Sequence, residues 1–280
     1  MQRVGVVGCG LMGAGIAEVS ARAGCDVVVA ESSDAAAEAG RQRLEASLKR
    51  AEAKGKISSA AEVLGRIRVV TDLAELADRE LVVEAIVEDE AAKVALFRQL
   101  DRILTDPEAI LASNTSSIPI MKLGVATGRP THVIGIHFFN PVPVLTLVEL
   151  VPSLLTESAT TERARAFVEG RLGKHAIDCQ DRAGFVVNAL LVPFILSAIR
   201  MFESGFASAE DIDQGLVLGA AHPQGPLALA DLIGLDTTKA VAESLYEEFK
   251  EPLYAPPPLL ARMVEAGLLG RKTGRGFYTY

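Results

Sequence analysis

Short apolar runs alternate with helix-like stretches through the first half of the chain. The runs are hydrophobic on both faces of an extended strand, which is typical of parallel strands covered by helices on both sides. They are Val4–Val7, Val27–Val29, Ile67–Val70, Leu81–Ile86, Ile110–Ala112 and Val133–Ile136. Helical patterns lie between them, as at Ala14–Ala23 and Ala35–Ala53. This alternation predicts an α/β fold built on a doubly wound, parallel sheet.

The pattern changes near Asp181–Gly184, beyond which helical periodicity continues with almost no strand signal. Ser208, followed three positions later by Asp211, is typical of a helix N-terminus. The helices expected in this part are Phe185–Ser204, Ala209–Leu218, Thr237–Phe249 and Pro258–Ala266. We therefore expect a doubly wound domain over residues 1–182 and a smaller all-α domain over residues 183–280.

Composition narrows the possible functions. A length of 280 residues suits two domains. The net charge of −8 disfavours general nucleic-acid binding, which depends on Lys and Arg at phosphates. The three cysteines show no CxxC spacing, which favours a reducing cytoplasm. The four histidines show no HxxxH or HxH spacing, so we predict no metal site. We see no signal peptide and no apolar run long enough for membrane insertion.

A glycine-rich motif joins the first apolar run to the first helical pattern. It is Gly8-Cys9-Gly10-Leu11-Met12-Gly13, in the strand–turn–helix context of a Rossmann-type dinucleotide site. Its glycines allow a tight turn, approach to a pyrophosphate and close packing of the helix, whose N-terminus attracts the anion. The second run ends at Glu31, an acid placed to accept hydrogen bonds from ribose hydroxyls and to repel a 2′-phosphate. The expected cofactor is therefore NAD rather than NADP.

Three segments carry polar residues where a sheet of this kind would end its strands. They are the cluster Ala112–Ser117, the segment Ile136–Pro143 with His137, and the apolar run Val148–Val151 with Glu149 inside it. Ligands of open α/β sheets bind in the crevice at the strand ends. A carboxylate buried between Val and Leu needs a partner, and His137 is an available one. From pattern alone, however, a lone His after a strand, Ser116 in a turn and Asn188 on a helix all have ordinary structural explanations.

The chain resembles the 3-hydroxyacyl-CoA dehydrogenase family along essentially its whole length. The matching motifs follow the family's order and spacing: SNTSS from Ser113, HFFNPVP from His137, GFVVN from Gly184, GLDT from Gly234 and KTGRGFY from Lys272. The resemblance is strongest to single-function bacterial members of the actinobacterial type. It implies interconversion of a short-chain L-3-hydroxyacyl-CoA and its 3-ketoacyl-CoA with NAD(H).

The resemblance also assigns roles to residues. The catalytic His falls on His137 and its partner on Glu149, with the substrate-contacting Ser on Ser116 and the active-site Asn on Asn188. A neutral imidazole can take the hydroxyl proton while a carboxylate fixes its tautomer. The implied NAD contacts are Gly8, Gly10, Leu11, Met12, Gly13, Glu31, Glu88, Lys93, Asn140 and Lys272. Without the resemblance, Lys93 and Lys272 would be read as solvated surface charges.

The acyl-CoA substrate requires a basic surface on this acidic protein. A stripe of Arg43, Ser47, Arg50 and Lys54 steps along one side of the second helical pattern, beside an apolar face of Leu44, Leu48 and Ala51. The resemblance places CoA contacts at Ser47 and Lys54, and it implies a homodimer formed through the helical domain. Ala189 stands where many relatives carry Arg after the GFVVN motif. We expect the loss of that cation to alter interdomain or dimer contacts, but it removes no proposed catalytic group.

Two other functions stay open on the sequence. One is a dehydrogenase of free 3-hydroxy acids, which would not need the basic stripe. The other is an NAD-binding protein without turnover, against which the joint presence of Ser116, His137, Glu149 and Asn188 speaks.

Overall fold

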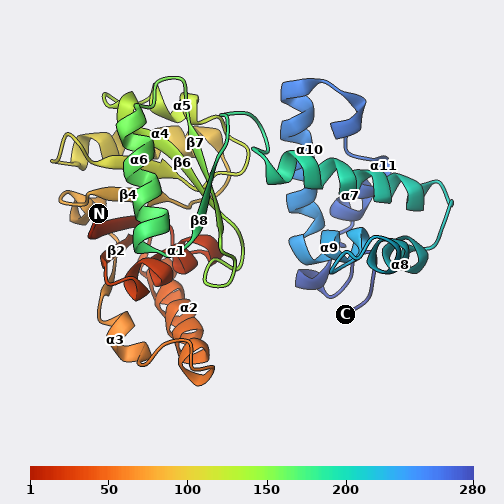
Figure 1. The fold of residues 1–280 in the computed structure, drawn as a ribbon, viewed down its shortest axis with the longest axis horizontal. Helices are drawn as coiled ribbons and strands as arrows, with labels where there is room; N and C mark the ends of the chain where they lie inside the picture. Colours follow the sequence, from red (N-terminus) through yellow and green to blue (C-terminus); the bar gives the residue numbers. More distant parts are fainter. The chain divides into compact units, whose positions relative to one another are not determined.

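The structure is a computed structural model that describes residues 1–280. It separates into two units, Met1–Arg182 and Ala183–Tyr280, which are described here one at a time (Figure 1). None of its helices is both long and apolar enough to cross a membrane.

An eight-stranded sheet forms the centre of the first unit, in the order β3-β2-β1-β4-β5-β6-β7-β8. Strands β1 to β6 run parallel to one another, whereas β7 runs antiparallel to β6 and β8 runs parallel to β7. The strands are β1 Arg3–Val7, β2 Asp26–Ala30, β3 Ile67–Val70, β4 Leu81–Glu84, β5 Ile110–Ser113, β6 Val133–Phe138, β7 Leu147–Pro152 and β8 His175–Asp178. The predicted doubly wound sheet is confirmed, with the reversed β7–β8 pair added at one edge.

Helices cover both faces of this sheet, as the two-sided hydrophobic runs predict. On one face Val4 and Val27 pack in a common core with Ile16 of α1 and Leu44 and Leu48 of α2. On the other face, Leu76 and Ile120 pack closely against Gly5 and Gly135, where a Cβ atom would come within 2.9 Å of the leucine and isoleucine side chains. The helices are α1 Leu11–Arg22, α2 Asp34–Ala53, α3 Ala60–Leu64, α4 Glu90–Ile103, α5 Ile120–Gly124 and α6 Ser158–Arg165, with the short 3-10 helices η1 Leu73–Leu76 and η2 Pro130–His132 and the π-helix η3 Ala166–Arg171.

The strand order reverses direction at β1, which has β2 on one side and β4 on the other. In doubly wound sheets a crevice opens outside the carboxyl ends of the strands at such a switch point. The glycine loop leaves β1 at this edge, and the segment that follows Glu84 leaves β4 there. The fold therefore gathers the polar loops of the first unit at one edge of the sheet.

The second unit is helical around its own apolar core. Ile195, Leu196 and Ile199 of α7 are fully buried together with Leu227 of α9 and Leu245 of α10. Its elements are α7 Val187–Glu203, α8 Ala209–Gly219, α9 Pro226–Ile233, α10 Leu235–Phe249, η4 Pro252–Tyr254, α11 Pro258–Glu265 and η5 Arg271–Thr273. Four of these helices match the predicted ranges closely, and the Ser208 side chain caps α8 by accepting the N–H of Asp211. Helix α9, which Pro226 opens, was not predicted.

The C-terminal motif is anchored by a buried carboxylate. Asp231 accepts hydrogen bonds from the backbone N–H groups of Phe277 and Tyr278, at 2.9 Å each. A Cβ atom on Gly276 would lie 1.9 Å from an oxygen of Asp231, so only glycine fits there. The motif from Lys272 onward thus closes the second unit as a packed element.

Candidate active site

The glycine loop has the shape that a dinucleotide requires. Gly8 has a φ of +91°, and a Cβ atom there would lie 2.7 Å from the carbonyl oxygen of Ala85. A Cβ atom on Gly13 would lie 1.8 Å from the Gly8 oxygen, so helix and turn touch at this point. A Cβ atom on Gly10 would meet nothing within 4 Å, because Gly10 faces open space. Since α1 has no side-chain cap, its first-turn N–H groups can receive an anion, and the loop fits a pyrophosphate.

Glu31 lies beside this loop at the end of β2. Its Oε1 accepts the backbone N–H of Cys9 at 2.5 Å, and its Oε2 accepts that of Ser32 at 3.1 Å. Burial, together with the charge of Glu31, raises the pKa of the Cys9 thiol to about 11. The thiol stays protonated at neutral pH, which leaves the loop without a nucleophile.

His137 and Glu149 lie directly opposite each other on the antiparallel strands β6 and β7. The Nδ1 atom of His137 is 2.7 Å from Oε2 of Glu149, and both side chains are buried. The sequence predicted that the strand ends at Ile136 and that His137 follows it. That prediction is wrong, because β6 continues through His137 to Phe138. A cross-strand pair is held by the ladder itself, so the imidazole and the carboxylate need no loop to position them.

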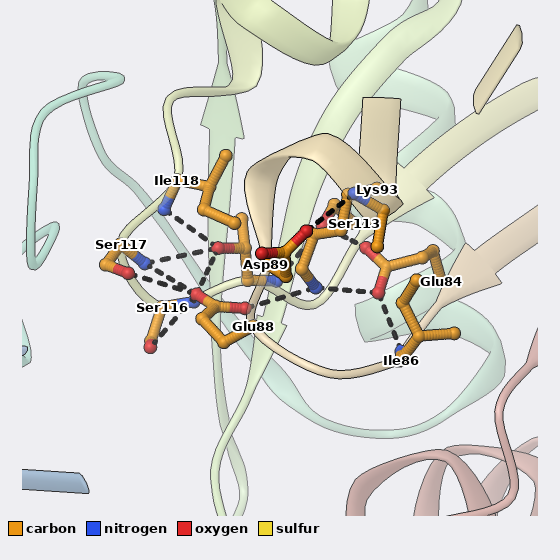
Figure 2. A network of polar contacts seen from close by, with 11 residues as sticks. Glu84, Ile86, Glu88, Asp89, Lys93, Ser113, Ser116, Ser117 and Ile118 are labelled. Carbon is orange, nitrogen blue, oxygen red and sulfur yellow. Dashed lines mark hydrogen bonds and ion pairs between the residues drawn. The ribbon is translucent and has the colours of Figure 1, made fainter. Parts of the chain in front are cut away.

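Glu88 organises the loop that carries Ser116 (Figure 2). Its Oε1 accepts from Thr115 Oγ1 at 2.5 Å, from the N–H groups of Ser116 and Ser117 at 3.0 and 3.2 Å, and from Ser117 Oγ at 3.1 Å. Ser116 Oγ is the most distant donor, at 3.5 Å. Burial by itself would raise the pKa of Glu88, but the Lys93 ammonium and the bonds from Thr115 and Ser116 hold it below its usual value. Glu88 is therefore an anion at neutral pH.

Lys93 joins Glu88 to a second carboxylate that the sequence analysis missed. Its Nζ lies 3.1 Å from Glu88 Oε2 and 2.6 Å from Glu84 Oε1 (Figure 2). Only 1% of the Lys93 side chain is exposed, so the interpretation as a solvated surface charge is wrong. Glu84 also accepts the Ser113 hydroxyl at 2.6 Å and the N–H of Ile86 at 2.7 Å. The sequence does contain a signal for Glu84 as a site residue, because it is the acid that ends the otherwise apolar strand β4.

The remaining predicted site residues are spread over both units. In the first unit, Asn140 is exposed beyond the end of β6, Ser47 is half-buried on α2, and Lys54 is exposed at the C-cap of that helix. In the second unit, Asn188 lies in the first turn of α7, and Lys272 pairs with Asp236 of the GLDT motif at 2.6 Å. The structure thus joins His137 to Glu149, Ser116 to Glu88, which Lys93 also contacts, and Glu31 to the glycine loop.

Comparison with known proteins identifies the family. A model described as 3-hydroxyacyl-CoA dehydrogenase, NAD binding domain, matches residues 3–182, and one for the C-terminal domain of the same family matches residues 184–280. A 3-hydroxybutyryl-CoA dehydrogenase of Mycobacterium tuberculosis is 60% identical over 282 residues, covering 100% of this chain and 99% of that protein. The human mitochondrial hydroxyacyl-coenzyme A dehydrogenase is 42% identical over 290 residues, covering 100% of this chain and 91% of that protein.

Solved structures give the same result. FadB2 of M. tuberculosis matches with a TM-score of 0.99 at 60% identity, covering 100% of this chain and 99% of that one. The (S)-3-hydroxybutyryl-CoA dehydrogenase of Ralstonia eutropha matches with a TM-score of 0.94 at 46% identity, with the same coverage. The two family models together span nearly the whole chain, and the chain belongs to the 3-hydroxyacyl-CoA dehydrogenase family.

Proposed function

We propose that the protein interconverts a short-chain L-3-hydroxyacyl-CoA, such as 3-hydroxybutyryl-CoA, and its 3-ketoacyl-CoA, such as acetoacetyl-CoA, with NAD(H). The observation that carries this proposal is the buried His137–Glu149 pair, in the same sheet as a glycine loop shaped for a dinucleotide. Relatives that carry the name 3-hydroxybutyryl-CoA dehydrogenase support the substrate class.

His137 is the general acid/base of this reaction. When bound, NAD supplies the acceptor for the hydride that leaves C3 of the substrate. His137 takes the hydroxyl proton in this direction and returns it to the ketone oxygen in the other. Its Nδ1 is engaged by Glu149, so Nε2 is the ring nitrogen that meets the substrate oxygen.

Glu149 is the partner that orients the imidazole. Its carboxylate accepts the Nδ1–H of His137, which fixes the tautomer with the basic nitrogen at Nε2. It also stabilises the imidazolium that forms when His137 takes the proton. The strand register, which places the two residues opposite each other, supports this role.

Ser116 and Asn188 are proposed to orient the substrate by donating hydrogen bonds to its oxygens. For Ser116, the support is that Glu88 Oε1 has more hydrogen-bond donors around it than it can accept from at full strength. Five donors lie within 3.5 Å of the single oxygen Oε1, which has two lone pairs. The Ser116 hydroxyl is the most distant of them and costs least to transfer to a substrate oxygen. For Asn188, the support is its place in the GFVVN motif.

The cofactor and CoA contacts complete the proposal. Gly8, Gly10, Leu11, Met12 and Gly13 would hold the pyrophosphate, and Glu31 the ribose. Glu88, Lys93, Asn140 and Lys272 are assigned to NAD, and Ser47 and Lys54 to CoA, by the family motifs that they occupy.

We further infer that the enzyme works in the cytoplasm as a homodimer, with residues 183–280 as its substrate and dimerisation domain. All three cysteines are buried and none forms a disulfide, which suits a reducing compartment.

A spectrophotometric assay tests the function. Purified protein with acetoacetyl-CoA should consume NADH, with NADPH and free acetoacetate measured in parallel. We expect turnover with NADH and acetoacetyl-CoA, and much slower turnover with NADPH. Preference for free acetoacetate would favour a dehydrogenase of free 3-hydroxy acids. Binding of NADH without consumption would favour a non-catalytic protein.

A further inference from the structure

Cys9 of the glycine loop is held at both of its backbone polar groups by side chains from other elements. Its N–H donates to Glu31 Oε1 at 2.5 Å. Its carbonyl oxygen accepts from Nη1 of Arg43, on α2, also at 2.5 Å. The Glu31 carboxylate and the Arg43 guanidinium thus hydrogen-bond to the N–H and the carbonyl group of the same residue, Cys9.

Helix α2 reaches the loop through a glycine. Gly40 is buried against Cys9, and a Cβ atom there would lie 2.6 Å from the Cys9 Cβ and 2.7 Å from its Sγ. Arg43 follows Gly40 by three positions, so both lie on the same side of α2. The close contact at Gly40 brings the Arg43 guanidinium within reach of the Cys9 carbonyl.

The bond from Arg43 also determines where the next N–H group points. The Cys9 carbonyl and the Gly10 N–H belong to one planar trans peptide, in which the two groups point in opposite directions. Holding the carbonyl oxygen toward α2 therefore turns the Gly10 N–H away from α2. Gly10 is the glycine of the loop whose Cα faces open space.

The positive charge of Arg43 also favours binding of a pyrophosphate at the loop. A backbone carbonyl near a pyrophosphate carries partial negative charge and repels it, whereas a charge-assisted bond to a guanidinium offsets that repulsion. Glu31 beside the loop adds a full negative charge, and a cation on the neighbouring carbonyl counters it.

We propose that Arg43 is a positioning residue for the cofactor, which orients the Cys9–Gly10 peptide so that Gly10 N–H binds the pyrophosphate of NAD. The inference rests on the proposed function for its ligand. It also corrects the expectation that Arg43 belongs to the basic stripe for CoA, because the structure directs its guanidinium to the glycine loop.

The test compares Arg43→Ala, Arg43→Lys and Lys49→Ala with the wild-type enzyme. Lys49 is a matched control, since it is a cation on the same helix, 72% exposed and paired only with Glu45 at 3.6 Å. The dissociation constant is measured for NADH by nicotinamide fluorescence, and for ADP-ribose and acetoacetyl-CoA by calorimetry. ADP-ribose carries the pyrophosphate without the nicotinamide, so it isolates the loop.

We expect Arg43→Ala to weaken the binding of NADH and of ADP-ribose by the same factor, about 10- to 150-fold for the loss of one charge-assisted bond. Arg43→Lys should fall between Arg43→Ala and wild type, because an ammonium keeps the charge but not the planar fork. Acetoacetyl-CoA binding and kcat should not change, and Lys49→Ala should match wild type throughout.

Three results would overturn the inference. Unchanged ADP-ribose binding in both Arg43 variants would remove Arg43 from the cofactor site while the proposed function stands. Weaker binding of acetoacetyl-CoA alone would return Arg43 to the CoA surface. Wild-type protein that binds neither NADH nor ADP-ribose would overturn both this inference and the proposed function.

Discussion

Lys93 places its ammonium 2.6 Å from the Glu84 carboxylate, and both side chains are almost wholly withdrawn from water. Removing one member of a buried ion pair leaves the other charge uncompensated, at a cost of about 3–5 kcal/mol. We therefore expect Lys93→Met to lower the free energy of unfolding by that amount in urea denaturation, with part of the loss restored by adding Glu84→Gln.

The matched control is Lys122→Met, which removes a lysine that is 53% exposed and 2.7 Å from Glu90. An exposed pair contributes about 0–1 kcal/mol, so this variant should stay close to wild type. Equal losses in the two lysine variants would contradict the distinction between the buried and the exposed pair.

The acid–base pair predicts a second outcome. Glu149→Gln should lower kcat for acetoacetyl-CoA reduction by about 100- to 10,000-fold, because the imidazole loses the carboxylate that fixes its tautomer. NADH binding, measured by fluorescence, should be retained. Glu108→Gln is the control, since Glu108 lies 3.7 Å from another imidazole, that of His132, and is 68% exposed. A Glu149→Gln enzyme with wild-type kcat would remove this carboxylate from the mechanism.

Two glycines of the same motif, Gly10 in the turn and Gly13 in α1, should respond differently to replacement by alanine. At Gly10 the added methyl group meets no protein atom within 4 Å. Gly10→Ala should therefore stay within about 0.5 kcal/mol of wild-type stability but weaken NADH binding about tenfold or more, because the methyl group occupies the approach to the pyrophosphate.

At Gly13 the same methyl group lies 1.8 Å from the Gly8 oxygen, so Gly13→Ala should destabilise the fold itself. Thermal unfolding measured beside NADH titration separates the two effects. If Gly10→Ala bound NADH as wild type does, the open face of Gly10 would not be the pyrophosphate site.

The lowered pKa of Glu88 predicts a pH dependence of stability. Burial opposes the shift, and Lys93 and the loop donors cause it. A carboxyl whose folded pKa lies below its unfolded value of about 4.3 stabilises the fold above that pH, and the contribution is lost as pH falls through the folded pKa. The difference in unfolding free energy between wild type and Glu88→Gln should be largest near neutrality and shrink on acidification. A difference that grows toward low pH would show that the carboxyl is not held as an anion.

Much of the fold could be predicted because it depends on local patterns. Two-sided apolar runs located strands β1 to β6. The glycine motif and Glu31 were then identified as the residues that follow the first and second of these runs. The reversed direction of β7 and the short β8 could not be predicted, because an apolar run does not encode whether its neighbour is parallel. Helix α9 was missed because all of its residues except Asp231 are apolar, so no alternation of apolar and polar positions marks a helical period.

The residues of the site could also be predicted from local sequence motifs, whereas their contacts with distant residues could not. The His137 and Glu149 roles came from family motifs, while their contact depends on a cross-strand register that only the structure supplies. Lys93 was open to interpretation as a surface charge because the side of α4 that faces Glu84 depends on how the helix packs. Arg43 was grouped with a basic stripe for the same reason, since its partner is a backbone carbonyl 34 positions away.

The hairpin of β6 and β7 shows how far apart in the sequence the parts of the site are encoded. Imidazole and carboxylate are separated by 12 positions, and one hairpin suffices to bring them together. The cradle for the dinucleotide instead needs β1, β2 and β4, with their intervening helices, to pair in register. Across small proteins, folding is faster when the contacts join residues that are close in sequence. The pair proposed to transfer the proton is thus encoded in a short stretch of chain, whereas the dinucleotide site depends on strands from β1 to β4.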